Sequence, residues 1–159
     1  MIQYRAAHIS DYDPLCLLLD EIDALHREAR PRTYRKPEGP VRERKYIEDI
    51  LADSDHLMFL AADDGGLVGI LHVSIQQAKD IPLMVPRSFA YIECIVVAET
   101  HKRRGIGSRL LEEAERWATS KGAKTIELGV LEFNQSAITF YHRAGFNTES
   151  RRMSKHLFA

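Results

Sequence analysis

The stretch that decides the fold is residues 92–111, IECIVVAETHKRRGIGSRLL. It begins with β-branched residues at positions 92 and 95–97, a run that favours a short buried strand over a helix. A basic turn follows, and from Ile106 onward apolar residues recur at the spacing of one helix face. The stretch therefore predicts a strand, a glycine-containing turn and a helix.

The turn has the chemistry of an anion site and consists of Lys102, Arg103, Arg104, Gly105, Ile106 and Gly107. The first backbone N–H groups of a helix have no partner within the helix, and the helix dipole there favours negative charge. Because the two glycines carry no side chains, a phosphate can approach the backbone closely. The turn predicts a phosphorylated ligand.

Three other readings of the turn have less support. A Walker loop requires GxxxxGK[ST], which is absent, and a dinucleotide-binding fingerprint requires a third glycine where the chain has Leu110. A nucleic-acid contact through residues 102–104 is weakly supported, because 22 Lys+Arg against 23 Asp+Glu leave a net charge of −1. We therefore expect no nucleic-acid partner.

The remaining sequence predicts one α/β (α+β) domain over residues 1–159, with elements in the order β-α-α-β-β-β-α-β-α-β. A central mixed, mostly antiparallel sheet flanked by helices follows from this order. The boundaries rest on a capping box at Ser10 and Asp13, a helix end before Pro31, a loop over 31–41, a hairpin turn at 63–66, a loop over 78–88, a strand over 125–131, a helix over 136–144 and a last strand from Phe146 toward Leu157.

Composition excludes several classes of protein. Hydrophobic residues at 45% and charged residues at 28% are typical of a globular protein. Cys16 and Cys94 have no CxxC spacing, which suits a reducing compartment. No apolar run approaches the ~18 residues of a membrane span. We expect a cytoplasmic protein with no membrane partner and no metal site.

A second motif reads Asn134-x-x-Ala137-x-x-Phe140-Tyr141-x-x-x-Gly145-Phe146. Together with Lys102-x-x-Gly105-x-Gly107, it makes the chain resemble the GNAT superfamily of N-acetyltransferases, which use acetyl-CoA. The first position of the turn departs from the usual Gln or Arg. The resemblance implies acetyl transfer to a primary amine of a small molecule or peptide, by direct attack in a ternary complex. Fold-level analogy also allows a homodimer.

The resemblance also implies how the co-substrate acetyl-CoA would lie. The backbone of Ile95, Val96 and Val97 would pair with the pantetheine arm, and the amides from Arg103 to Ser108 would hold the pyrophosphate. Arg103 or Arg104 would add phosphate contacts or face solvent, and Asn134 would lie beside the pantetheine. Tyr141 would protonate the departing thiolate, because a phenol with a pKa of ~10 carries its proton at neutral pH.

Glu93 is the candidate base. An acid inside YIECIVV, on a strand expected to be buried, needs a partner or a wet cleft, and burial would raise its pKa. A structural ion pair with an arginine is the competing interpretation. Glu127 and His72 are reserve candidates, although His72 is more commonly a half-buried structural histidine.

The acceptor amine is not readable from the sequence. Residues 27–45 hold eight basic and three acidic residues, either a solvated face or a rim that favours amines carrying carboxylate or phosphate over polycations. A non-catalytic CoA-binding or sensor protein on the same scaffold is the alternative function. It would keep the turn but would not need Tyr141 or Glu93.

Overall fold

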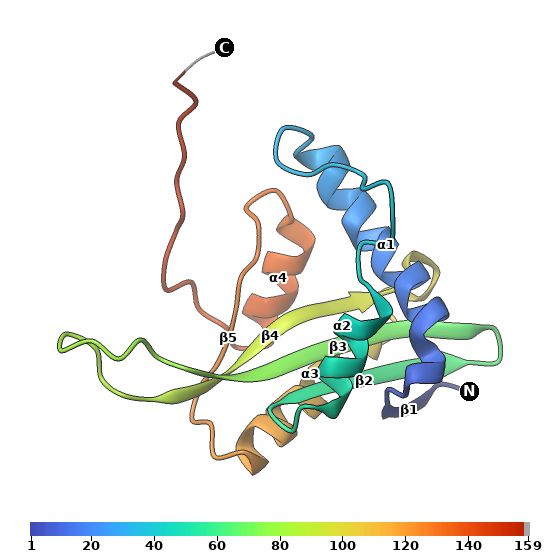
Figure 1. Ribbon diagram of the computed structural model, residues 1–159, viewed down its shortest axis with the longest axis horizontal. Helices are drawn as coiled ribbons and strands as arrows, with labels where there is room; N and C mark the ends of the chain where they lie inside the picture. The colour runs from blue at the N-terminus through green and yellow to red at the C-terminus, as the bar shows by residue number, and fades with distance from the viewer. Residues whose placement is uncertain (158–159) are drawn as a thin grey trace. The chain divides into compact units, whose positions relative to one another are not determined.

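The computed structural model describes residues 1–157 (Figure 1). These residues divide into two units after Gly129, residues 1–129 and the described residues from 130 onward. The organisation of residues 1–159 as a single domain stays a prediction.

The first unit contains a five-stranded sheet in the order β1-β2-β3-β4-β5. Its strands are β1 (Gln3–Ala6), β2 (His56–Asp63), β3 (Gly66–Gln77), β4 (Ser88–Val97) and β5 (Ile126–Leu128). The first four strands pair antiparallel with their neighbours, whereas β4 and β5 run parallel. The predicted mixed, mostly antiparallel sheet is confirmed.

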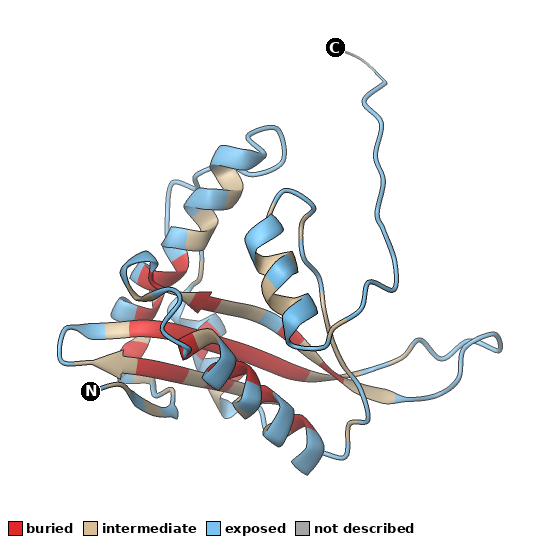
Figure 2. Cartoon of the chain, turned by 180° about the vertical axis from the view of Figure 1, so that it is seen from behind, coloured by how far each residue is buried: buried red, intermediate tan, exposed pale blue. Residues whose placement is uncertain are grey.

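Helices cover both faces of this sheet. Helices α1 (Tyr12–Ala29) and α2 (Arg44–Ala52) lie on one face and α3 (Ile106–Ser120) on the other, and two 3₁₀ turns, η1 (Ile9–Asp11) and η2 (Glu99–His101), precede α1 and α3 (Figure 1). Residues 68–74 of the central strand β3 are all buried (Figure 2). Apolar side chains on both faces of β3 therefore form the core, as expected for a strand covered twice.

Two register shifts interrupt the ladders. Ala62 pairs with Leu67 but Ala61 pairs with Gly69, so Val68 is an extra residue in β3. A second shift between β3 and β4 leaves Glu93 as the extra residue of β4. Such bulges redirect the side chains beyond them, because a shift of one residue exchanges the two faces of a strand.

Most predicted boundaries of this unit agree with the structure. Helix α1 ends at Ala29, before Pro31, and the hairpin turn joins Asp63 to Gly66. The loop between β3 and β4 extends away from the sheet (Figure 1). The predicted capping box is displaced by two residues, because His8 and Asp11, rather than Ser10 and Asp13, cap η1. Strand β5 is shorter than predicted.

The second unit contains α4 (Gln135–Arg143). It ends at a left-handed glycine, Gly145 (φ 93°), where the Phe146 amide donates to the Tyr141 carbonyl at 3.0 Å, so the expected glycine C-cap is confirmed. The predicted last strand is wrong: the described residues from Phe146 onward form no strand. Residues 147–152 read NTESRR and lack alternating apolar side chains, and in the described chain β5 pairs only with β4.

Gly69 lets α3 pack closely on the sheet, and Gly69→Ala tests this contact. A Cβ at this position would lie 3.0 Å from Ile106 Cγ2 and 3.1 Å from Leu110 Cδ1. We expect the substitution to lower the free energy of unfolding by about 1–3 kcal/mol through overpacking, measured by urea denaturation. Gly39→Ala is the matched control, because a Cβ there has no neighbour within 4 Å. Equal stabilities of the two variants would contradict the prediction.

Candidate active site

Strand β4 leaves its neighbour β5 halfway along its length. The two strands pair only at Ala90–Ile126, Tyr91–Glu127 and Ile92–Leu128, whereas β4 continues to Val97. Over residues 93–97, the edge of β4 away from β3 therefore has no partner strand within the described chain. Unpaired N–H and C=O groups on such an edge can bind an extended ligand as an added strand. This edge includes Ile95, Val96 and Val97.

The turn after β4 exposes backbone amides. Arg103 (φ 62°) and Gly105 (φ 80°) both adopt left-handed conformations, which is uncommon for a residue with a side chain. Gly105 is the N-cap of α3 and has no side chain that could cap the helix. The first helical hydrogen bond runs from the Arg109 amide to the Gly105 carbonyl at 3.0 Å. The amides of residues 106–108 therefore face an anion site without a side-chain competitor. These amides are free of intrahelical partners and available to an anionic group.

The basic side chains of the turn differ in their environment. Lys102, at the position where the motif usually has Gln or Arg, forms an ion pair with Glu99. Arg103 and Arg104 are exposed and form no ion pair with any described residue. Two cations therefore remain for a polyanionic ligand. The contribution of the backbone amides to anion binding does not depend on the side chain of Lys102.

A polar contact holds the turn against the β2–β3 hairpin. His101 Nε2 lies 2.9 Å from Asp63 Oδ2, and Asp63 Oδ1 accepts from the Gly65 amide at 2.8 Å. The hydrogen bond from Gly65, more than the contact with His101, lowers the pKa of Asp63. The hairpin turn thereby positions the residue that precedes Lys102.

Glu93 lies at the bulge of β4, where β5 has already left the sheet. Its Oε1 accepts from Ser74 Oγ at 2.7 Å and from Gln76 Nε2 at 3.1 Å. The residue is exposed, so the expectation that its strand would bury it is wrong. No lysine or arginine among the described residues forms an ion pair with it. The bulge explains the exposure, because it turns an acid out of a strand whose regular positions are buried.

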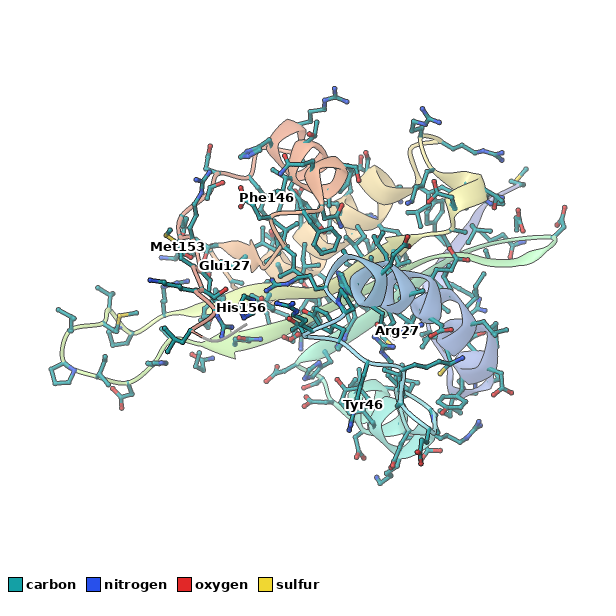
Figure 3. The ribbon with its side chains drawn as sticks, turned by 90° about the horizontal axis from the view of Figure 1, so that it is seen from above. Arg27, Tyr46, Glu127, Phe146, Met153 and His156 are labelled. Atoms are coloured by element: carbon teal, nitrogen blue, oxygen red, sulfur yellow. The ribbon has the colours of Figure 1, made fainter. Side chains whose placement is uncertain are left out.

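The two reserve bases have structural partners. Glu127 on β5 (Figure 3) pairs with Arg87 at 2.6 Å, a contact that ties the start of β4 to β5. His72 is 6% exposed and its Nε2 lies 2.9 Å from Nδ1 of His56 on β2. Burial lowers the pKa of His72 to about 4, so its imidazole is neutral at neutral pH. No pattern in the sequence indicates that His56 is the partner of His72.

An ion pair between α1 and the following loop lies near these groups. Arg42 forms a two-pronged contact with Asp23, at 2.6 and 3.2 Å, and its carbonyl accepts from the Tyr12 hydroxyl at 2.7 Å. Burial raises the pKa of the neighbouring Cys94 thiol to about 11, so this cysteine is not a thiolate nucleophile at neutral pH. The ion pair between Arg42 and Asp23 anchors the α1–α2 loop.

Ion pairs also reduce the positive charge expected for residues 27–45. Arg27 on α1 (Figure 3), Arg42, Arg44 and Lys45 each pair with an acid outside this segment, namely Asp20, Asp23, Glu48 and Asp49. When these four acids are counted, the local excess of five positive charges falls to one. The remaining exposed cations of the loop are Arg30, Arg32, Arg35 and Lys36. The interpretation as a rim for anionic acceptors loses most of its basis.

The second unit contains the two site residues of the later motif. Asn134 is the N-cap of α4, and its Oδ1 accepts from the Ala137 amide at 3.2 Å and from the Ser136 hydroxyl at 3.1 Å. The Tyr141 ring contacts Phe140 and Phe146, with centroids 5.2 and 5.6 Å apart (Phe146 is labelled in Figure 3). The motif therefore builds the helix cap and an aromatic cluster, and its roles toward a ligand stay predictions.

Residues 1–157 lack the features of a membrane span and of a metal centre. No helix there is long and apolar enough to cross a membrane. No group of three or more His, Cys, Asp or Glu side chains in the same residues could hold a metal ion.

Comparisons with known proteins agree with this geometry. The model of the acetyltransferase (GNAT) family matches residues 19–146. An uncharacterised N-acetyltransferase from Lactobacillus delbrueckii subsp. lactis is 28% identical over 150 residues, 88% of this chain and 83% of that protein. Streptothricin acetyltransferase from Escherichia coli is 32% identical over 101 residues, 64% of this chain but only 53% of that protein.

A solved structure shares the whole fold. The F44R mutant of the BH1408 protein from Bacillus halodurans superposes with a TM-score of 0.92, covering 98% of this chain and 99% of that one at 24% identity. This likeness supports the arrangement of helices and strands, and it carries no information on the substrate.

The buried neutral His72 predicts a loss of stability in acid. Its pKa is about 4 in the folded chain and ~6.5 when unfolded, so between these values only the unfolded state binds the proton. The free energy of unfolding should therefore fall as the pH drops from about 6.5 to 4, by up to about 3 kcal/mol. Urea denaturation across this range should show a shallower fall for His72→Gln than for the wild type and for His8→Gln. Parallel curves for His72→Gln and the wild type would contradict the prediction.

Proposed function

Because this chain belongs to the acetyltransferase (GNAT) family, we propose that it transfers the acetyl group of acetyl-CoA to a primary amine of a small molecule or peptide, by direct attack in a ternary complex. The observation that carries the proposal is the open edge of β4 leading into the uncapped start of α3. An extended arm and a pyrophosphate joined in one ligand match these two adjacent features.

The binding of acetyl-CoA uses mainly backbone groups in this proposal. Ile95, Val96 and Val97 pair with the pantetheine arm, and the amides from Arg103 to Ser108 hold the pyrophosphate. Arg103 and Arg104, which have no ion-pair partner in the described chain, add charge to the phosphate contacts. Asn134 contributes its side-chain amide beside the pantetheine while its carbonyl oxygen caps α4. Acetyl-CoA supplies an activated thioester carbon.

The chain must remove a proton from the acceptor before attack. A lysine-like ammonium has a pKa of ~10.4, so the neutral amine costs roughly 4–5 kcal/mol at pH 7. Glu93 suits this task because it is exposed at the bulge and is held by two neutral donors, Ser74 and Gln76, without a neutralising cation. The carboxylate accepts the proton directly or through a water molecule. Tyr141 then protonates the departing thiolate.

An acceptor panel tests the proposal. Purified protein is mixed with acetyl-CoA and with amino acids, polyamines, peptides, phosphorylated amines and streptothricin, and thiol release is followed. Streptothricin is included because a relative is named for acetylating it. Acceptor-dependent thiol release supports the proposal. Acetyl-CoA binding measured by calorimetry without thiol release for any amine would instead support the non-catalytic CoA-binding protein.

Tyr141→Phe removes the proposed acid and keeps the ring. We expect turnover at saturating substrate to fall by about 10²-fold, with little change in the affinity for acetyl-CoA, because only the hydroxyl is lost. Steady-state kinetics and calorimetry measure the two quantities. Tyr4→Phe on the edge strand β1 is the control and should match the wild type. Unchanged turnover in Tyr141→Phe would remove the assignment.

Glu93→Gln removes the proposed base and retains a side chain that can contact Ser74. We expect kcat/KM for the acceptor to fall by roughly 10²–10³-fold at neutral pH and to recover partly in alkaline buffer, where free amine becomes abundant. The measurement is the pH dependence of kcat/KM. Glu115→Gln, on the exposed side of α3, serves as the control. A profile with the wild-type shape and height would place the base elsewhere.

A further inference from the structure

The His56–His72 pair connects the buried sheet to solvent. His72 on β3 is 6% exposed, whereas the side chain of His56 on β2 is 28% exposed. The two ring nitrogens lie 2.9 Å apart, and His56 Nε2 lies 3.9 Å from the Asp53 carboxylate at the end of α2. Two neutral imidazoles in this arrangement share one proton, with one ring as donor and the other as acceptor. When His72 Nε2 is the donor, His72 Nδ1 can accept a proton and His56 Nε2 carries a proton that it can release.

The inner end of the pair faces the Glu93 cluster. Ser74, which donates to Glu93 at 2.7 Å, lies two residues after His72 and therefore on the same face of β3. Burial lowers the pKa of His72, and among the neighbouring charges Glu93 opposes this most strongly. The other ionisable groups around the ring are Arg42, which is paired with Asp23, and the neutral thiol of Cys94.

Acetylation of an ammonium group requires a route for one proton. An ammonium group and a thioester react to give an amide, a thiol and one free proton. In the proposed function, Glu93 takes up this proton. In the proposed ternary complex, the acceptor amine would cover the exposed side of Glu93. His56, by contrast, reaches solvent from β2, which lies two strands away from β4 in the sheet. A path across the face of the sheet would restore Glu93 without the departure of a substrate.

Building on the proposed function, we infer that His72 and His56 form a proton relay that carries the acceptor's proton from Glu93 to solvent. The proton leaves the Glu93 carboxyl through one water molecule and binds His72 Nδ1. His72 Nε2 passes its own proton to His56 Nδ1, and His56 Nε2 releases a proton to water beside Asp53. No electrons are transferred, and each ring is neutral again at the end. Rotation of the two rings about their Cβ–Cγ bonds, followed by proton exchange between His56 and water, restores the starting tautomers without returning the proton to Glu93.

His56→Gln tests the relay. Glutamine keeps a polar side chain at a half-exposed position but cannot be protonated and deprotonated at neutral pH. In weakly buffered solution we expect kcat to fall about 5–20-fold, with the KM values for acetyl-CoA and acceptor unchanged. Imidazole at tens of millimolar should restore kcat, because a small base replaces the missing exit group. His8→Gln, at the cap of η1, should show neither the loss nor the rescue.

Each outcome decides between the two proposals. A wild-type protein that acetylates no amine rejects the proposed function and the relay with it. An active wild type beside a His56→Gln variant of equal kcat rejects the relay alone. A lowered kcat that imidazole does not restore also rejects it, since a packing defect would behave in this way. Thermal melting of both variants shows whether the folded fraction differs at the assay temperature.

Discussion

The packing of α3 on β3 at Gly69 is the contact on which the candidate site depends. Ile106 is the first residue of α3 and lies over Gly69 together with Leu110, and both side chains are almost fully buried. Burial of two such side chains contributes on the order of 3–6 kcal/mol. The same contact places the uncapped helix start directly after the open edge of β4. Hydrophobic packing on one face of the sheet thus positions a polar site at its edge.

The two bulges determine which polar side chains meet on one face of the sheet. The extra residue in β4 turns Glu93 out toward Ser74 and Gln76 and coincides with the point where β5 leaves the sheet. The extra residue in β3, Val68, shifts the β2 register by one. Without that shift, His56 and His72 would lie on opposite faces and could not share a proton. Both histidines and the acid therefore face the α1–α2 side because of two local irregularities.

Local signals in the sequence predicted local structure well. Proline and glycine marked the end of α1, the hairpin and the C-cap at Gly145, because each restricts or permits particular backbone angles regardless of distant contacts. Predictions that required long-range partners were less reliable. Among the described residues after Phe146 there is no strand, since a strand exists only where a ladder partner is available. Glu93 is exposed because a bulge, which no sequence pattern predicted, turns it outward.

The sequence by itself determined the strand–turn–helix unit, the two motifs and, through them, the family, because these depend on residue type and spacing along the chain. Only the tertiary structure decided which polar side chains meet. The contacts of Glu93 with Ser74, His56 with His72 and Arg42 with Asp23 join residues 16 to 19 positions apart. They depend on strand register and helix placement, which buried apolar area selects across the whole unit. The sequence could thus predict a ligand class for the turn at Gly105, whereas it could not predict that His56 and His72 lie together.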